Sequence, residues 1–136
     1  MVLDEEFLTI HGKRVKLKPN LNCKSFGLYA ALCTNCDSNY VGQTKNSFSN
    51  RWTAHRATWK KLKSKFNKED ISDECALYRH YYYNHKNNLE NLSIDEAYRV
   101  AFLEQPCFQS LDYKEQFWMD KLKSNINLAK TPYNGL

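Results

Sequence analysis

Apolar and polar residues alternate in two short runs near the start of the chain. In residues 28–33 leucine and alanine recur at every second position, which is the period of a half-buried strand. A second short run covers residues 40–44, and residues 34–39 between the two runs are mainly turn formers. The pattern therefore predicts an antiparallel hairpin that brings Tyr29 and Tyr40 close together.

The period changes to that of a helix over residues 47–66, where Asn46 or Ser47 is a suitable N-cap. On a helical wheel Arg51 and His55 project from the apolar stripe of this helix or from beside it. In one interpretation Arg51 is a charged side chain that reaches the surface and His55 is a buried core histidine. In the other, both belong to a functional site. The stripe consists of Phe48, Trp52, Trp59, Leu62 and Phe66.

A second helix and a third strand are predicted next. The helix is capped by Ser72 or Asp73 and continues to His85. The strand covers residues 96–103, which are rich in aromatic and β-branched residues, and Pro106 ends it. We expect this strand to join the hairpin in one sheet.

A last helix is predicted over residues 111–123, with Ser110 as its cap. Glu115 falls within the apolar stripe of this helix, and a buried carboxylate is costly unless it is paired or bound to a metal. From the residues alone Glu115 is either in a buried salt bridge, for which Arg51 is a candidate partner, or a metal ligand. The stripe is formed by Leu111, Trp118 and Leu122.

Residues 1–22 have the pattern of a small basic hairpin or edge strand. Apolar residues 7–10 precede a His11-Gly12 turn, and residues 13–18 alternate charged with apolar side chains. A solvated edge is favoured over a DNA-contacting arm, because edge strands carry lysines for solubility. Pro19-Asn20 marks a boundary, so we expect the main domain to cover residues 23–136.

Two cysteines and two histidines have the spacing of a zinc site. Cys33 and Cys36 lie in the hairpin loop with two residues between them, and His80 and His85 have four residues between them. The histidines converge only if their helix ends or distorts between them, for which Asn84 is a suitable place. A set of four protein ligands leaves no open position, so this zinc would be structural.

Composition limits the class of protein. A chain of 136 residues is one domain, no apolar run can span a bilayer, and the acidic N-terminus is unlike a signal peptide. We therefore expect a soluble, intracellular protein with no membrane partner. Five cysteines cannot all pair, which favours thiols or metal ligation. Cys75 is a rival zinc ligand, whereas Cys23 and Cys107 are expected to be structural.

The net charge of +5 permits a polyanionic partner without requiring one. A run of lysines lies on the back of the first helix, where they can form a solvated face or contact phosphates without sequence preference. These two interpretations stay open and do not exclude each other. The residues are Lys60, Lys61, Lys63 and Lys65, followed by Lys68.

The order of the residues singled out above resembles the GIY-YIG nuclease domain. Gly27-Leu28-Tyr29 is followed, after ten residues, by Tyr40-Val41-Gly42, and Arg51, His55 and Glu115 come later in the chain. The added pairs of cysteines and histidines resemble, more narrowly, the endonuclease domain of Penelope-like retroelements. The resemblance covers the chain from about residue 24 to its end.

This resemblance implies an α/β fold with a small, three-stranded, mainly antiparallel sheet flanked by helices and a structural zinc site. It implies that Glu115 holds one Mg²⁺ or Mn²⁺ ion and that Arg51 binds the scissile phosphate. Tyr29 and Tyr40 would orient and deprotonate the attacking water, with His55 as the alternative base or a phosphate contact. The zinc ligands would be Cys33, Cys36, His80 and His85.

The last polar position of the family is matched best by Asn127. Asn134 is a competing candidate, and so is a residue beyond Leu136, because the retroelement relatives typically continue past this point. We expect the chain to be one domain of a larger protein that also carries a reverse transcriptase.

By resemblance the function is metal-dependent nicking of double-stranded DNA, with the nuclear chromosome as target. The nick would leave a 3′-hydroxyl that primes reverse transcription. Two alternatives stay open. The first is a GIY-YIG nuclease of another setting, either homing or structure-specific repair. The second is a catalytically inactive, zinc-stabilised DNA-binding module.

Overall fold

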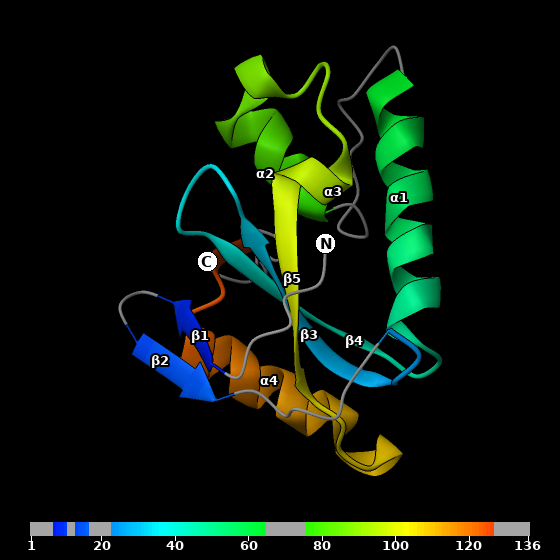
Figure 1. The fold of residues 1–136 in the computed structure, drawn as a ribbon, viewed down its shortest axis with the longest axis vertical. Helices are drawn as coiled ribbons and strands as arrows, with labels where there is room; N and C mark the ends of the chain where they lie inside the picture. Colours follow the sequence, from blue (N-terminus) through cyan, green and yellow to red (C-terminus); the bar gives the residue numbers. More distant parts are fainter. Residues whose placement is uncertain (1–6, 11–12, 17–22, 65–75, 127–136) are drawn as a thin grey trace, which may run out of the picture.

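The computed structural model describes residues 7–10, 13–16, 23–64 and 76–126. Within these ranges the strands and the longer helices follow the order expected from the sequence (Figure 1). Several predicted features lie outside the described residues: the His11-Gly12 turn, Lys65, Phe66, Lys68, Cys75, Asn127 and Asn134.

The central sheet has three antiparallel strands in the order β4-β3-β5. Strand β3 covers Gly27–Cys33, β4 covers Asn39–Thr44 and β5 covers Tyr98–Glu104. The hairpin of β3 and β4 is the one predicted from the alternating pattern, and β5 pairs with the other side of β3. The middle strand is therefore buried along its whole length, and β4 forms one edge of the sheet.

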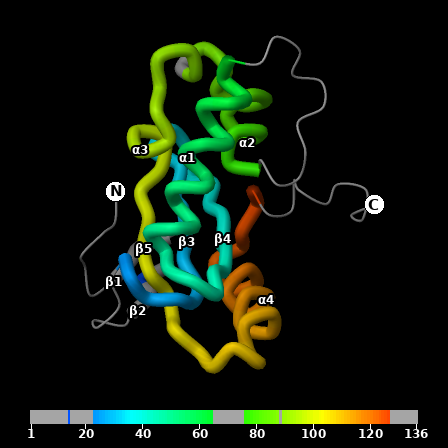
Figure 2. The backbone as a smooth tube through the Cα atoms, turned by 90° about the vertical axis from the view of Figure 1, so that its right-hand side faces the viewer, coloured from blue at the N-terminus to red at the C-terminus, as the bar shows by residue number. Residues whose placement is uncertain are grey.

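One face of the sheet is covered by α1 (Phe48–Ser64) and α2 (Ala76–Asn84). The described residues of the stripe predicted for α1 are all buried: Phe48, Trp52, Trp59 and Leu62. The rings of Trp59 and Tyr78 pack edge to face with centroids 5.2 Å apart, and Figure 2 shows α2 beside the C-terminal half of α1. A short 3₁₀ helix, η2, follows α2 at Lys86–Asn88.

The opposite face of the sheet is covered by α4 (Leu111–Leu122), which gives the domain three layers. Its buried residues Leu111, Trp118 and Leu122 form the predicted stripe and pack on Leu28, Ala30, Leu32 and Val41 of the hairpin. The two faces of β3 thus belong to two separate apolar clusters. The strand alternation decides which side chains face which helix.

The prediction of a strand beginning at residue 96 was wrong for its first two residues. Ile94–Ala97 form the short helix α3, and β5 begins only at Tyr98. Ser93 caps α3 by accepting from the backbone N–H of Glu96, while the Glu96 side chain accepts from the Ser93 backbone. This capping box gives hydrogen-bond partners to the backbone N–H groups of Ser93 and Glu96, and it therefore favours a helical turn at these residues.

Ser110 is the residue before α4, as predicted. The prediction that its side chain caps the helix was wrong, because that side chain makes no capping hydrogen bond. Its hydroxyl lies 3.1 Å from the Cys107 sulfur instead. A 3₁₀ helix, η3 (Phe108–Ser110), leads directly into α4 and holds Ser110 in a helical rather than an extended conformation. An extended backbone at the N-cap is what normally lets a serine side chain reach the helix N–H groups.

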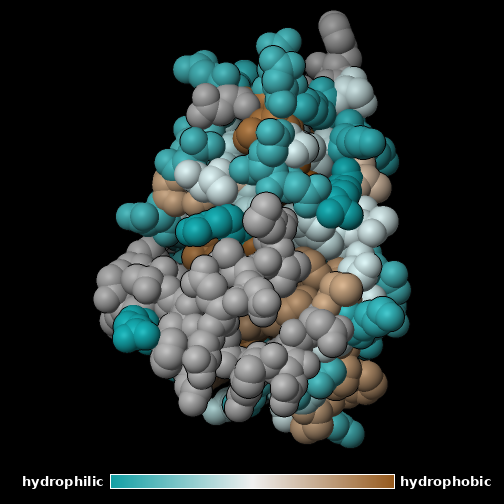
Figure 3. All heavy atoms as spheres, viewed as in Figure 1, coloured by the Kyte–Doolittle hydropathy of each residue, from teal (hydrophilic) through white to brown (hydrophobic). Residues whose placement is uncertain are grey.

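Two short strands lie in the N-terminal region for which the sequence predicts a basic hairpin or edge strand. Strands β1 (Phe7–Ile10) and β2 (Lys13–Lys16) pair antiparallel and form a sheet of their own. No helix among the described residues is long and apolar enough to cross a membrane. Figure 3 shows hydrophilic side chains predominating over the end of the molecule that contains α2 and α3.

Gly27 begins β3 in a conformation that favours glycine. Its φ angle is +134°, and a Cβ atom at this position would lie 2.3 Å from the backbone oxygen of Glu104. The pairing of β3 with β5 is irregular at the next residues, Leu28 and Tyr29, as in a β-bulge. Glycine therefore lets the strand start with its backbone against β5.

We predict that Gly27→Ala lowers the free energy of unfolding by about 2 kcal/mol or more, because a side chain there is strained and meets backbone that cannot move aside. Urea denaturation measures the change. Lys61→Ala, at an exposed position on α1, is the control and should change the free energy by about 0.5 kcal/mol or less. Equal stability of the two variants would contradict this view of the strand start.

Candidate active site and metal centre

Tyr29 and Tyr40 stand side by side on the face of the sheet that α1 covers. Their ring centroids are 6.4 Å apart, and both residues are buried. Tyr29 lies on the middle strand, β3, and Tyr40 lies on the edge strand, β4. The β3 residue that pairs with Tyr40 is Ala31. The predicted proximity of the two tyrosines is confirmed.

Gly42 makes room for the Tyr29 ring. The two residues are paired across the hairpin, and a Cβ atom on Gly42 would lie 2.5 Å from the Tyr29 hydroxyl oxygen. The same Cβ would lie 2.9 Å from a ring carbon of Tyr40. The phenol of Tyr29 therefore crosses the bare backbone of β4, which explains why a glycine follows Tyr40 and Val41.

His55 projects from α1 onto these tyrosines. Its Nε2 atom lies 2.9 Å from the Tyr29 hydroxyl, and the residue is only 8% exposed. Burial, together with the positive charge of Arg51, lowers the pKa of His55 to about 3. His55 is therefore a neutral imidazole near neutral pH, and its contact with Tyr29 orients both rings.

Arg51 lies one helical turn before His55, close enough to Tyr29 and Tyr40 for its guanidinium to act on both hydroxyls. Burial raises the pKa of both phenols, and the charge and hydrogen bonds of Arg51 act in the opposite direction. Arg51 is exposed as a whole residue, so its charge is also open to a ligand. It is the fixed positive charge of this site.

Glu115 approaches from the other side of the sheet, on α4. Its negative charge raises the pKa of both Tyr29 and Tyr40, which places the carboxylate within electrostatic reach of the phenols. The expectation that Glu115 points into the core is corrected, because the residue is partly exposed. The physical reason is that β4 is an edge strand, so this part of α4 extends to the rim of the sheet.

An open cleft of about 410 Å³ adjoins this group. Arg51 and Gln43 line it together with the connection from β4 to α1, and no carboxylate is among its lining residues. The cleft thus offers a guanidinium, an ammonium and side-chain amides to an anionic ligand. Its lining residues are Gln43, Thr44, Lys45, Asn46, Asn50, Arg51 and Ala54.

The four predicted zinc ligands come together at the other end of the hairpin. One ligand atom from each of Cys33, Cys36, His80 and His85 lies within 4.8 Å of the other three. The Cys36 sulfur is 3.4 Å from Nε2 of each histidine. With Zn–S and Zn–N bonds of about 2.3 and 2.0 Å, the edges of a zinc tetrahedron measure about 3.3–3.8 Å. The cluster therefore fits a zinc ion.

The histidines converge for the reason predicted from the sequence. Helix α2 ends at Asn84, so His80 is helical and His85 follows the helix, with the two rings 5.0 Å apart. Burial, and secondarily the neighbouring His85, lower the pKa of His80 to about 4. A neutral imidazole is the form that binds a metal. Among the described residues these four supply a complete tetrahedral ligand set.

A second layer of contacts surrounds the cluster. The Cys33 sulfur accepts a hydrogen bond from the backbone N–H of Asn35 and lies 3.3 Å from the Tyr81 hydroxyl. That hydroxyl donates to the Ala97 carbonyl at 2.8 Å, which ties the cluster to the start of β5. Such contacts orient metal ligands and support a structural centre.

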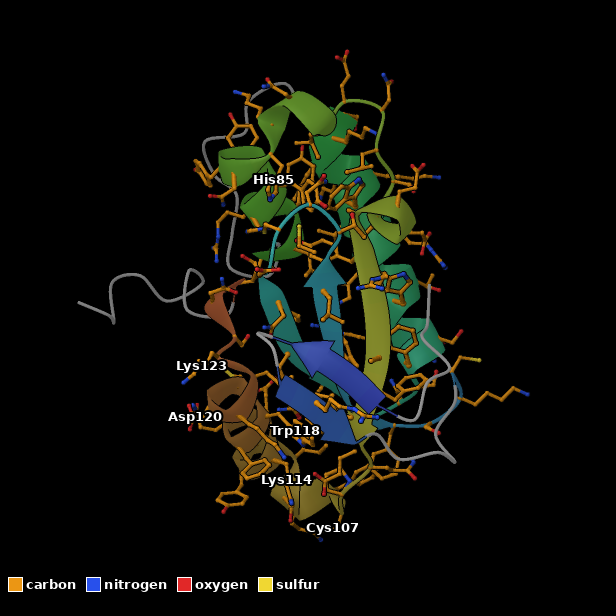
Figure 4. All side chains as sticks on the ribbon, turned by 60° about the vertical axis from the view of Figure 1, so that its left-hand side comes forward. His85, Cys107, Lys114, Trp118, Asp120 and Lys123 are labelled. Carbon is orange, nitrogen blue, oxygen red and sulfur yellow. The ribbon has the colours of Figure 1, made fainter. Side chains whose placement is uncertain are left out.

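Cys23 and Cys107 are exposed and lie outside the cluster, so they do not have the buried positions expected of structural cysteines. In Figure 4 His85 and Cys107 are at opposite ends of the molecule. Cys107 instead contacts Ser110, and this hydrogen bond lowers the pKa of its thiol.

The fold has a counterpart among solved structures. The catalytic domain of homing endonuclease I-TevI is similar, with 22% sequence identity and a TM-score of 0.51, over 76% of this chain and 94% of that chain. Comparisons with protein-family models and with curated proteins find no match. The likeness shows the fold: a three-stranded antiparallel sheet with flanking helices, as the GIY-YIG resemblance implies.

The structure brings together five of the six predicted catalytic residues, and the sixth, Asn127, lies outside the described residues. Sequence reasoning missed Gln43 and Asp112, which contact each other beside Glu115. The signal for Gln43 was a polar side chain at an alternate strand position that shares a face with Val41. Tyr81 was also missed, because a tyrosine in a run of three carries no special pattern.

We predict that the purified chain contains one zinc ion and that Cys36→Ala removes it. Loss of a tightly bound ion should lower the free energy of unfolding by about 4 kcal/mol, as for a ligand at a thousandfold its Kd. Metal analysis and urea denaturation measure the two effects. Cys107→Ala, which removes an exposed thiol outside the cluster, should keep both zinc and stability. A zinc-free wild-type protein of full stability would contradict the assignment.

We predict that the ring signals of His55 do not titrate between about pH 8 and pH 5, because its folded pKa lies far below that of an ordinary histidine. The unfolded chain takes up this proton near pH 6.5, so acidification below that pH favours unfolding. His55→Gln should flatten this part of the stability profile. An NMR titration midpoint near pH 6.5 for His55 would contradict the prediction.

Proposed function

We propose that this chain is a metal-dependent DNA endonuclease that hydrolyses phosphodiester bonds. The observation that carries the proposal is the meeting of two phenols, a guanidinium, a neutral imidazole and a carboxylate around the open edge of β4. These groups come from four separate elements, β3, β4, α1 and α4. The likeness to a homing endonuclease catalytic domain supports the same class of reaction.

Arg51 is proposed to bind the scissile phosphate. Its guanidinium acts electrostatically on Tyr29 and Tyr40, and the residue also lines the cleft, so its positive charge lies between the phenols and the place where DNA can enter. A planar guanidinium can donate two parallel hydrogen bonds to phosphate oxygens. It also offsets the negative charge that develops on the phosphate as a fifth oxygen approaches.

Glu115 is proposed to hold one Mg²⁺ or Mn²⁺ ion. The carboxylate fits such an ion, because it is partly exposed at the rim of the sheet, where one of its oxygens accepts from Gln43 and water can complete the coordination. When bound, the ion supplies charge neutralisation and lowers the pKa of coordinated water. Glu115 and Arg51 therefore carry opposite charges on the two sides of the phenol pair.

One of the two tyrosines, in its phenolate form, is proposed to take the proton of the attacking water and afterwards to release it to solvent as the neutral phenol. Burial raises the pKa of both tyrosines, so each needs a positive charge nearby to act as a base. Arg51 provides part of that charge. The contact with neutral His55 holds the Tyr29 hydroxyl in a fixed position, and His55 is the second candidate for proton acceptance.

DNA is proposed to bind through its backbone. Lys45 lies in the cleft, and Lys60 and Lys61 are exposed farther along α1, whereas Lys63 donates a hydrogen bond to the Leu92 carbonyl. Charges of this kind give salt-dependent affinity without base readout.

We also propose that the nick serves a retroelement. The support is the assembly of Cys33, Cys36, His80 and His85 at one point, which is the pattern that resembles Penelope-like elements. In that setting the chain is one part of a larger reverse-transcriptase protein acting on chromosomal DNA in the nucleus. Its 3′-hydroxyl product then primes DNA synthesis.

The test of activity is the nicking of supercoiled plasmid with Mg²⁺ or Mn²⁺. We expect the wild-type chain to form nicked circles and both Glu115→Gln and Tyr40→Phe to lower the rate by about a hundredfold or more, since each removes a group that acts in the transition state. Asp120→Asn is the matched control on α4, and Figure 4 shows Asp120 on the outward side of that helix.

Plasmid that stays intact with the zinc-loaded wild-type chain, although the chain binds it in low salt, would contradict the proposal and favour a DNA-binding module. Active protein allows a further comparison of linear, flapped and branched duplexes. Equal rates on all three support a target-nicking role, while a strong preference for flaps or branches supports structure-specific repair.

A further inference from the structure

Gln43 occupies a position on β4 that faces α4. Side chains alternate along the strand, so Gln43 shares its face with Val41, which is buried against α4, and not with Tyr40. Gln43 lies near the end of the edge strand, where the sheet stops and the cleft begins. It is therefore the β4 residue best placed to contact both α4 and the cleft.

The Gln43 amide contacts two carboxylates at once. Its Nε2 atom donates to Oδ1 of Asp112 at 2.8 Å and to Oε1 of Glu115 at 3.3 Å. Asp112 and Glu115 are three residues apart on α4 and therefore lie on the same side of the helix. The amide nitrogen has two N–H groups, one for each carboxylate, so the side chain satisfies both acceptors.

The two carboxylates also fix the orientation of the amide. An inverted Gln43 would place its carbonyl oxygen against Asp112 and Glu115, where three acceptors would repel one another. Without the shared donor, Asp112 and Glu115 would repel each other as like charges one turn apart. The two hydrogen bonds therefore fix the side-chain orientations of Gln43, Asp112 and Glu115 relative to one another.

We propose that Gln43, anchored by Asp112, is the positioning residue that directs the Glu115 carboxylate towards the phenol pair and the cleft. This inference rests on the proposed function of Glu115 as a metal ligand. A partly exposed glutamate has several side-chain torsions and loses freedom when it binds an ion. Holding it beforehand in one rotamer removes that cost from metal binding, as contacts around ligands do in metal sites generally.

The same helix offers a control pair of matching chemistry. Gln116 donates to Asp120 at 2.9 Å, also between an amide and a carboxylate, but both residues are exposed and neither lines the cleft. If amide–carboxylate contacts only stabilise α4, breaking either pair should have the same effect. If Gln43 positions Glu115, only its own pair should affect the metal.

The experiment measures Mn²⁺ binding by electron paramagnetic resonance of the free ion, with the zinc-loaded chain and no DNA. We expect Gln43→Ala and Asp112→Ala each to weaken the Glu115-dependent binding by about tenfold, the usual size of an effect from a residue that orients a metal ligand. Asp112→Asn should recover much of this loss, because its side-chain oxygen still accepts from Gln43. Gln116→Ala should bind as the wild type does.

Nicking supplies a second readout. The Mg²⁺ concentration for half-maximal rate should rise about tenfold in Gln43→Ala, with a rate at saturating Mg²⁺ close to that of the wild type. Melting temperatures should stay within a few degrees for all variants, since surface contacts contribute little.

Three results would overturn the inference while leaving the proposed function in place. Wild-type Mn²⁺ affinity in Gln43→Ala would show that the amide does not position Glu115. Loss of binding in Asp112→Ala alone would make Asp112 a direct ligand. A fall in melting temperature that accompanies the loss of binding would make the contact a support of the fold. A wild-type chain that neither nicks DNA nor binds Mn²⁺ through Glu115 would remove the proposed function and this inference together.

Discussion

The packing of the Tyr29 ring on the bare backbone of Gly42 is the contact on which the rest of the site depends. A side chain at residue 42 would occupy the space of the phenol. Because the ring lies across the hairpin, its hydroxyl reaches the far strand and meets His55 and Arg51 from α1. The same packing places Tyr40 beside it. Because Gly42 has no Cβ atom, polar groups from β3, β4 and α1 can come together within the apolar layer between the sheet and α1.

Strand β3 joins this centre to the cysteine–histidine cluster. Tyr29 and Cys33 lie on the same face of the strand, at opposite ends of one apolar cluster. The loop after Cys33 is short of apolar side chains, and its contacts with α2 run through Cys36, the histidines and Tyr81. A zinc ion at this point would fix the loop to α2 and thereby the end of the strand that carries Tyr29.

Local patterns predicted much of this architecture because they depend on near neighbours in the chain. Alternation over residues 28–33 gave the strand and its two faces, and the end of a helix at Asn84 gave the convergence of His80 and His85. Residues 96–97 were predicted as strand because apolar residues follow them. They are helical because Ser93 and Glu96 form a capping box, whose signature is present in the sequence.

The remaining features depend on how the layers are stacked, which periodicity does not reveal. A helical wheel places Glu115 in the stripe of α4 but cannot show that the sheet ends beside it. For the same reason the contact of Gln43 with Asp112 and Glu115 was not predicted: it requires knowing that α4 covers the face of β4 opposite to Tyr40. The polar site is formed where two layers meet around an open strand edge.

The most direct test of the central claim is product analysis after cleavage of an end-labelled duplex in water enriched with oxygen-18. The account predicts a 5′-phosphate that contains one solvent oxygen, a 3′-hydroxyl, and no DNA attached to protein, because water attacks the phosphate that Arg51 holds. A covalent adduct between DNA and Tyr29 or Tyr40 would contradict it, since a phenol would then be the nucleophile rather than a base.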